Sequence, residues 1–181
     1  QGLELGYSVL SSKGAWDIAR PFLDHLSEEI RESVSAAVLD KFEVVYVSGT
    51  QYHRVISVGI TVGARFAAHC TATGRVLLAA QPPEMWPGIL QNIPLFPMTD
   101  RTVTDRNEFR KILETVRDKG WSIVDQELEK GLLSIAVPLR NSFGGLVGAI
   151  NVGAPTLRMS ADNMVETVLP KLQQTAATIS Q

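Results

Sequence analysis

Cysteine, histidine and an excess of positive charge are scarce in this sequence. Its 181 residues include one Cys and three His, and 17 Lys and Arg stand against 19 Asp and Glu. A single cysteine excludes an internal disulfide, and the three histidines lack the close spacing that zinc ligands show. The net charge of −2 gives no sign of the basic face that nucleic-acid binding requires.

Long apolar runs and common catalytic motifs are also missing. No run approaches the roughly 20 apolar residues of a membrane span, and no charged-then-apolar leader opens the chain. The sequence contains no phosphate-binding glycine loop, Rossmann glycine pattern or serine nucleophile elbow. We therefore expect a cytoplasmic protein of ordinary domain size, with no metal, no cofactor and no membrane partner.

Two periodicities in the chain predict an α+β fold. Apolar residues at helical spacing predict helices at 15–30, 71–80, 104–119 and 160–179, with a short one after Pro82. We expect Pro21 to bend or start the first helix and Pro170 to kink the last. Runs of β-branched and aromatic residues predict strands, at 34–39, 44–47, 54–62, 121–125, 132–139 and 145–152. Most strands are joined by hairpins, which predicts an antiparallel sheet of about six strands flanked by helices.

The stretch from Gly63 to Ala80 combines a polar loop with the longest apolar run. Thr71 is the predicted N-cap of the helix at 71–80, and Thr73 and Gly74 fall in its first turn. The unpaired amides and positive dipole of such a helix start favour binding of a small carboxylate. The alternative is a capped core helix whose threonines bond only to the backbone.

His69 and Cys70 are adjacent within that stretch. An imidazole can activate a thiolate, so one alternative function is a hydrolase of small acyl substrates that uses this pair. Side chains of consecutive residues diverge, however, which makes the geometry hard to satisfy. A histidine just before a helix is more often a hydrogen-bonded structural residue than a ligand.

Polar residues also interrupt the later strands. Asp125 and Glu127 belong to an acidic loop between two predicted strands, while Ser134 and Asn151 lie inside apolar runs. A buried hydroxyl or amide needs a hydrogen-bond partner, which either the backbone or a ligand can supply. This distribution favours a binding pocket between sheet and helix over a catalytic triad.

Three motifs in this order and spacing resemble the ligand-sensing domain of the IclR family of bacterial transcriptional regulators. They are Gly63-x-Arg65-x-x-x-His69-x-x-x-x-Gly74-Arg75-Val76-Leu77-Leu78-Ala79, Glu127-x-x-x-Gly131-x-x-Ser134-Ile135-Ala136-Val137-Pro138, and Gly148-Ala149-Ile150-Asn151-Val152. The segment Leu5 to Ser12 and the motif Pro97-x-Thr99-x-x-Thr102 are most similar to the branch that regulates aromatic-acid catabolism through the β-ketoadipate pathway.

This resemblance implies a GAF/profilin-like fold and a non-enzymatic function. A small carboxylic acid such as protocatechuate or p-hydroxybenzoate would bind between the sheet, the 71–80 helix and the 125–134 loop. Residues 1–13 would be a linker from an N-terminal winged helix-turn-helix outside this sequence, the only part to contact DNA. Residues 14–181 would be the effector-binding domain, assembled as a homodimer or homotetramer.

We expect the acid's carboxylate to meet the amides at the start of the 71–80 helix, assisted by Arg65 or His69. A ring hydroxyl would meet Asp125, Glu127 or Ser134. No catalytic residue is predicted. The predicted ligand-binding residues are Arg65, His69, Cys70, Thr71, Ala72, Thr73, Gly74, Asp125, Glu127, Ser134 and Asn151.

Overall fold

The computed structural model describes residues 13–50 and 61–180. Within them, six strands form one antiparallel sheet in the order β3-β2-β1-β6-β5-β4. The strands are β1 (Ser33–Asp40), β2 (Glu43–Thr50), β3 (Arg65–Ala67), β4 (Ser122–Asp125), β5 (Leu132–Arg140) and β6 (Leu146–Pro155). The helices are α2 (Lys13–Ile30), η1 (Ala68–Cys70), α3 (Ala72–Ala79), η2 (Pro83–Met85), α4 (Trp86–Asn92), α5 (Arg106–Lys119), α6 (Ala161–Asn163), η3 (Met164–Val168) and α7 (Leu169–Ile179). The predicted antiparallel α+β architecture is confirmed.

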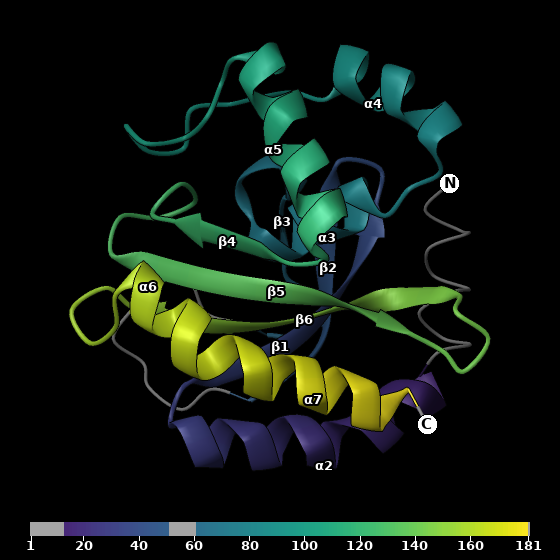
Figure 1. Ribbon diagram of the computed structural model, residues 1–181, viewed down its shortest axis with the longest axis vertical. Helices are drawn as coiled ribbons and strands as arrows, with labels where there is room; N and C mark the ends of the chain where they lie inside the picture. The colour runs from purple at the N-terminus through teal and green to yellow at the C-terminus, as the bar shows by residue number, and fades with distance from the viewer. Residues whose placement is uncertain (1–12, 51–60, 181) are drawn as a thin grey trace.

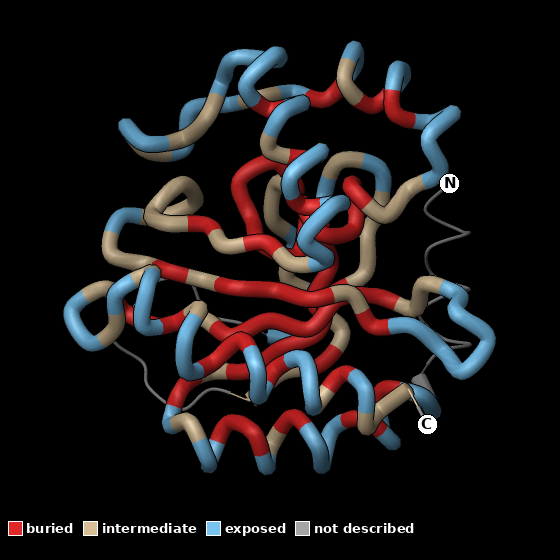
Figure 2. Tube along the Cα trace, viewed as in Figure 1, coloured by how far each residue is buried: buried red, intermediate tan, exposed pale blue. Residues whose placement is uncertain are grey.

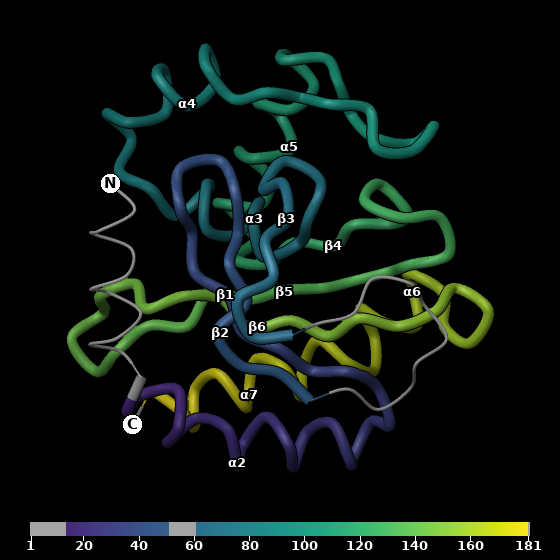
Figure 3. The backbone as a smooth tube through the Cα atoms, turned by 180° about the vertical axis from the view of Figure 1, so that it is seen from behind, coloured from purple at the N-terminus to yellow at the C-terminus, as the bar shows by residue number. Residues whose placement is uncertain are grey.

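Helices cover both faces of the sheet. Helices α2 and α7 lie together on one face, while α3 packs on the other, with α5 and α4 outside it (Figure 1). Seen from behind, the hairpin of β1 and β2 lies beside α3 (Figure 3). Buried residues line the sheet and the sides of α2 and α7 that face it (Figure 2). Two apolar clusters result, one on each face.

The two faces receive different residues because side chains alternate along a strand. In β5, Leu133 and Ile135 join the apolar cluster under α2 and α7. Ser134 and Ala136, between and after them, belong to the α3 side of the sheet. The same alternation of large and small residues continues at 149–153 in the neighbouring strand β6.

The observed helices begin and end within two residues of the ranges predicted from the sequence. The Asp105 carboxylate accepts a hydrogen bond from the Glu108 amide at 2.9 Å and so caps α5. Gly120 ends that helix with a left-handed φ of 82°. Ser160 caps α6 in the same way as Asp105.

Two local expectations, both at prolines, need adjustment. Helix α2 continues through Pro21. A π-helical turn at Met164–Val168 interrupts the last helix before Pro170, which then lies in the first turn of α7, where proline is well accepted. The strand predicted at 54–62 falls mostly outside the described residues, and β3 begins only at Arg65. None of the helices described here has the length and apolar character needed to cross a bilayer.

Candidate functional site

A small cavity lies between the α3 side of the sheet, the turn before α3 and the loop that joins β4 to β5. Its volume is about 40 Å³. Its floor comes from alternate residues of β2, β4, β5 and β6, and its rim from the 126–131 loop. The lining residues are Tyr46, Cys70, Thr71, Val124, Leu128, Leu132, Ser134, Asn151 and Gly153. None of them is an acidic or basic side chain, so the cavity is neutral and partly apolar.

Tyr46 supplies one polar group of this cavity. Burial raises the pKa of its hydroxyl to about 12, and the neighbouring Thr73 hydroxyl lowers that pKa by less. The phenol therefore stays protonated at neutral pH and can donate a hydrogen bond. The Thr73 hydroxyl is itself buried and has no hydrogen bond of ordinary geometry within the part of the chain that the structure describes.

Asn151 and Ser134 supply further donors from the sheet. The Asn151 amide oxygen accepts a hydrogen bond from Ser35 on the adjacent strand β1. This bond leaves the amide NH2 group of Asn151 for the cavity. Ser134 is half-buried and its hydroxyl has no side-chain or backbone partner in residues 13–50 and 61–180. Three neutral donors therefore stand around one small space.

The start of α3 closes the cavity on the helix side. Thr71 Oγ1 accepts from the Gly74 amide at 3.1 Å and donates to the Ala67 carbonyl at 3.1 Å, which confirms Thr71 as the N-cap. The amides of Ala72 and Thr73 have no acceptor among the described residues. Such amides, at the positive end of a helix, favour an anion nearby.

Gly74 makes this tight turn possible. A Cβ atom at position 74 would lie 2.1 Å from the Ala68 carbonyl oxygen and 2.5 Å from Thr71 Oγ1. Only a residue without a side chain allows α3 to start so close to the preceding η1 turn. Gly74 is thus a structural residue that positions the N-cap.

A buried ion pair that the sequence analysis missed fixes the loop over the cavity. Arg75 is only 2% exposed, and its two terminal nitrogens donate to the Glu127 carboxylate at 2.9 and 2.6 Å. Arg75 Nε also donates to the His69 carbonyl at 2.8 Å, and Glu127 Oε1 accepts from the Val103 amide at 3.0 Å. The Glu127 carboxylate therefore accepts three hydrogen bonds, and Glu127 is not among the residues that line the cavity, so this placement does not support its predicted contact with a ring hydroxyl.

The segment before α5 holds the same loop from outside. The hydroxyls of Thr99 and Thr102 donate to the carbonyls of Gln126 and Glu127, at 2.7 and 2.6 Å respectively. The loop backbone is thus tied to the 96–103 segment, while its next residue, Leu128, lines the cavity. Because Leu128 directly follows these residues, its movement would also displace the hydrogen-bonded carbonyls of Gln126 and Glu127.

Two other predicted site residues lie on the surface. The Arg65 guanidinium bonds to Asp40 and Glu43 of the first hairpin, and these carboxylates raise its pKa. Asp125 pairs with Arg101 at 3.4 Å. Neither residue lines the cavity, because Arg65 sits on the short edge strand β3 and Asp125 at the outer end of β4. The expected assistance from Arg65 and the expected hydroxyl contact of Asp125 are not supported by this placement.

His69 and Cys70 are buried in the η1 turn and have structural contacts. His69 Nε2 bonds to the Phe96 carbonyl at 2.8 Å, and burial lowers the histidine pKa. Burial also raises the pKa of the Cys70 thiol to about 12. At neutral pH the pair is an uncharged imidazole and a protonated thiol, which is the opposite of an activated nucleophile. Among the described residues, no three His, Cys, Asp or Glu side chains are grouped to hold a metal.

The structure thus sorts the eleven predicted site residues into three groups. Cys70, Thr71, Ser134 and Asn151 line the cavity. Five surround or support it without lining it: His69, Ala72, Thr73, Gly74 and Glu127. Arg65 and Asp125 lie outside. Residues missed by the sequence analysis are Tyr46, Val124, Leu128, Leu132 and Gly153 in the lining and Arg75 in the support.

The family described as "Bacterial transcriptional regulator IclR C-terminal" matches residues 7–181. This chain belongs to the IclR family. It is the effector-binding domain of an IclR-type regulator, as its fold and relatives together show. The family resemblance inferred from the three sequence motifs is confirmed.

Three relatives are similar to this IclR domain over most of its length. The Pca regulon regulatory protein of Pseudomonas putida is 36% identical over 171 residues, covering 94% of this chain and 59% of that protein. A transcriptional regulator from a Rhodococcus species has a solved structure with a TM-score of 0.90 and 40% identity, over 99% of this chain and 73% of that one. The inducer-binding domain of PobR from Acinetobacter, a double mutant in complex with 3-hydroxybenzoic acid, has a TM-score of 0.86 and 32% identity, over 92% and 97% of the two chains.

Proposed function

We propose that this IclR domain senses a single-ring hydroxy acid of the hydroxybenzoate class, bound in the cavity beside α3. The observation that carries the proposal is the set of neutral donors from Tyr46, Ser134 and Asn151 around one partly apolar cavity. The complex of the similar PobR domain with 3-hydroxybenzoic acid supports the ligand class. Contact with DNA through a separate head, and assembly as a homodimer or homotetramer, stay predictions.

The carboxylate would be bound without a cationic side chain. The phenol of Tyr46 and the amide of Asn151 can each donate to a carboxylate oxygen, and hydrogen bonds to a charged acceptor are the stronger kind. The positive end of α3 lies next to them and adds favourable electrostatics. Apolar contacts from Val124, Leu128 and Leu132 would hold the ring.

The size of the cavity makes loop movement part of the proposal. An engineered cavity that accepts benzene measures about 150 Å³, whereas this one measures about 40 Å³. A ring can enter only if a wall moves outward, and Leu128 is carried by a surface loop. Its displacement would pull on Glu127 and hence on Arg75, α3 and the 96–103 segment. A ligand that favours the open loop would shift the population of the domain toward that state.

Ligand binding can be tested by thermal unfolding and calorimetry. We expect 3-hydroxybenzoate, 4-hydroxybenzoate or protocatechuate to stabilise the domain, by roughly 2.7 kcal/mol at 100 times the dissociation constant. Tyr46→Phe removes only the hydroxyl and should weaken binding by about tenfold, the value of one hydrogen bond to a charged group. Ser142→Ala, in the exposed β5–β6 turn, is the matched control. Absence of stabilisation by all three acids, or equal affinity of Tyr46→Phe and wild type, would contradict the proposal.

We also infer that the domain is not an acyl hydrolase. A thiol with a pKa of about 12, compared with an ordinary 9.0, forms thiolate about a thousandfold less at neutral pH. Native Cys70 should therefore react far more slowly with iodoacetamide than the same thiol in urea. Turnover of activated esters that disappears in Cys70→Ala would overturn this inference.

A further inference from the structure

A second cavity lies at the opposite end of α3, where α3 and α5 both end above β5. Its volume is about 270 Å³. Its apolar walls include Val76, Val116 and Pro138, and its charged residues are Arg117 of α5 and Arg140 of β5. No acidic side chain lines it. This cavity is separate from the one beside the α3 N-terminus, with which it shares no lining residue.

Gln81, and not an arginine, bonds to the last carbonyls of α3. The Gln81 backbone and side chain donate to the last carbonyls of α3, at 3.2 Å to Leu78 and 3.0 Å to Leu77. The Trp86 indole N–H in turn donates to the Gln81 carbonyl at 3.2 Å. The carbonyls of Leu77, Leu78 and Gln81 therefore have partners other than a guanidinium.

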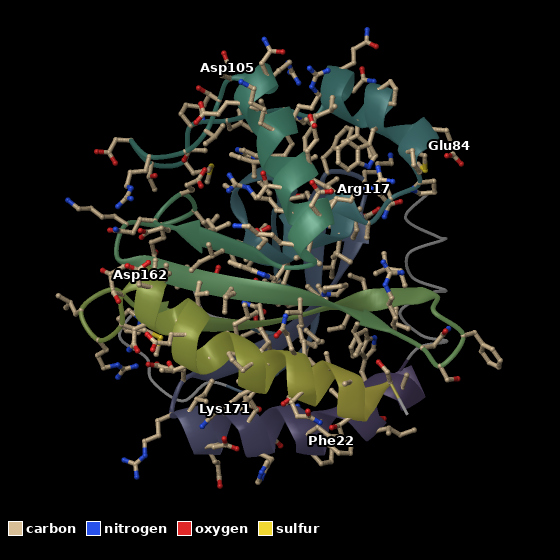
Figure 4. The ribbon with its side chains drawn as sticks, in the orientation of Figure 1. Phe22, Glu84, Asp105, Arg117, Asp162 and Lys171 are labelled. Atoms are coloured by element: carbon tan, nitrogen blue, oxygen red, sulfur yellow. The ribbon has the colours of Figure 1, made fainter. Side chains whose placement is uncertain are left out.

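Arg117 and Arg140 also lack carboxylate partners within residues 13–50 and 61–180. The Arg117 guanidinium lies 5.5 Å from the centre of the Trp86 ring, and Arg140 Nη1 donates to the Gly144 carbonyl at 3.1 Å. Glu84 is at the same end of the molecule (Figure 4) but does not line the cavity. Each guanidinium carries five N–H donors, so most of this donor capacity is left for solvent or an anion.

We propose that this cavity is a second ligand site, for a small organic carboxylate with an apolar body. The two guanidiniums would bind the carboxylate, and the valine and proline walls would contact the body. A volume of about 270 Å³ exceeds the roughly 150 Å³ that suffices for benzene. Its volume therefore does not require a wall to move before an aromatic ring can enter, unlike that of the first cavity. This site does not depend on the function proposed above.

Benzoate is the probe for a direct test by NMR titration of the domain. The indole N–H resonance of Trp86 is a local reporter, because its acceptor Gln81 belongs to the cavity wall. We expect that resonance to shift with benzoate, and Arg117→Gln and Arg140→Gln each to weaken this binding by about tenfold. Arg110→Gln is the matched control, since Arg110 lies exposed on α5 and faces Glu114 at 3.6 Å. An unchanged Trp86 resonance, or equal effects of the three substitutions, would overturn the second site.

Two further measurements separate this site from the first cavity. Ser134→Leu places a larger side chain in the first cavity and should leave the Trp86 response to benzoate intact. Loss of that response in folded Ser134→Leu would overturn an independent second site. Inorganic phosphate tests the apolar part of the proposal, because it lacks a body to contact the valine and proline walls. Phosphate binding as tight as benzoate binding would overturn the assignment to organic acids.

Discussion

The two faces of the sheet are built from the same strands but from different kinds of residue. Toward α2 and α7 the strands present large aliphatic side chains such as Ile135 and Val152, which form a continuous apolar cluster. Toward α3 the central strands β5 and β6 present mainly small or polar residues such as Ser134 and Asn151, and the helix itself buries a charged residue, Arg75. Small residues leave space, and buried polar groups need specific partners. The first face thus suits stability, and the second suits a cavity that a ligand can enter.

The largest loss of stability is expected from Gly74→Ala, because the start of α3 has no room for an added atom. Gly74→Ala places a Cβ at 2.1 Å from the Ala68 carbonyl oxygen, so either η1 or α3 must move. We expect a loss of more than about 3 kcal/mol in the free energy of unfolding, or failure to fold. Urea denaturation followed by circular dichroism measures the change.

Gly88→Ala is the matched control for this substitution. Gly88 also lies in a helix, but a Cβ there would meet nothing within 4 Å. Alanine is favoured over glycine in a helix by up to about 1 kcal/mol. This variant should be as stable as wild type or slightly more so. A Gly74→Ala domain of wild-type stability would show that α3 is not held against η1.

The next largest effect is expected from the buried ion pair. Arg75→Leu leaves the Glu127 carboxylate without its cation, and breaking a buried pair in this way costs about 3–5 kcal/mol. The double variant Arg75→Leu with Glu127→Leu removes both charges and should recover much of that loss. Chemical denaturation of the single and double variants measures the coupling.

The exposed pair of Arg101 and Asp125 is the control for the buried one. These side chains lie 3.4 Å apart and are 52% and 37% exposed. Surface pairs contribute less than about 1 kcal/mol, so Arg101→Leu should change stability little. Equal losses of stability in Arg75→Leu and Arg101→Leu would show that the buried pair contributes no more to folding than the exposed pair.

A substitution on the opposite face should affect stability without affecting ligand binding. Leu23 of α2 is fully buried in the cluster under α2 and α7, and a buried leucine replaced by alanine costs about 2–5 kcal/mol. The folded fraction of Leu23→Ala should bind hydroxybenzoates with wild-type affinity. Ser134→Ala should do the reverse, with small loss of stability and weaker binding. Calorimetry at a temperature where both variants are folded distinguishes the two faces.

Part of this difference between the faces can be read in the sequence. The run from Leu133 to Val137 alternates large with small residues, which predicts one face for a core and one for close approach or a cavity. The N-caps Thr71 and Asp105 were also predictable, because capping depends on residues three positions away. Local patterns of this kind set the elements and their buried sides.

Contacts between distant segments could not be predicted in the same way. Arg75 stands in an apolar helix turn, which indicates a buried partner but does not identify Glu127, 52 positions later. Tyr46 enters the cavity because β2 reaches α3 across the sheet, and no nearby residue signals this. Asp125 and Glu127 look alike in sequence, yet a strand end and a loop direct one outward and the other to Arg75.

The smallest expected effect concerns the pH dependence of the α3 face. Burial lowers the pKa of His69 below its unfolded value near 6.5, so the unfolded chain binds a proton more readily than the folded domain. This contribution to stability is complete above pH 6.5 and is lost as pH falls toward the lower, folded pKa.

His69→Gln should be less stable than wild type at pH 7.5, with the difference narrowing at pH 5.5. His25→Gln, on the exposed side of α2, is the matched surface control. Urea midpoints at the two pH values give the comparison, and a constant gap between His69→Gln and wild type would show that His69 does not titrate differently on folding.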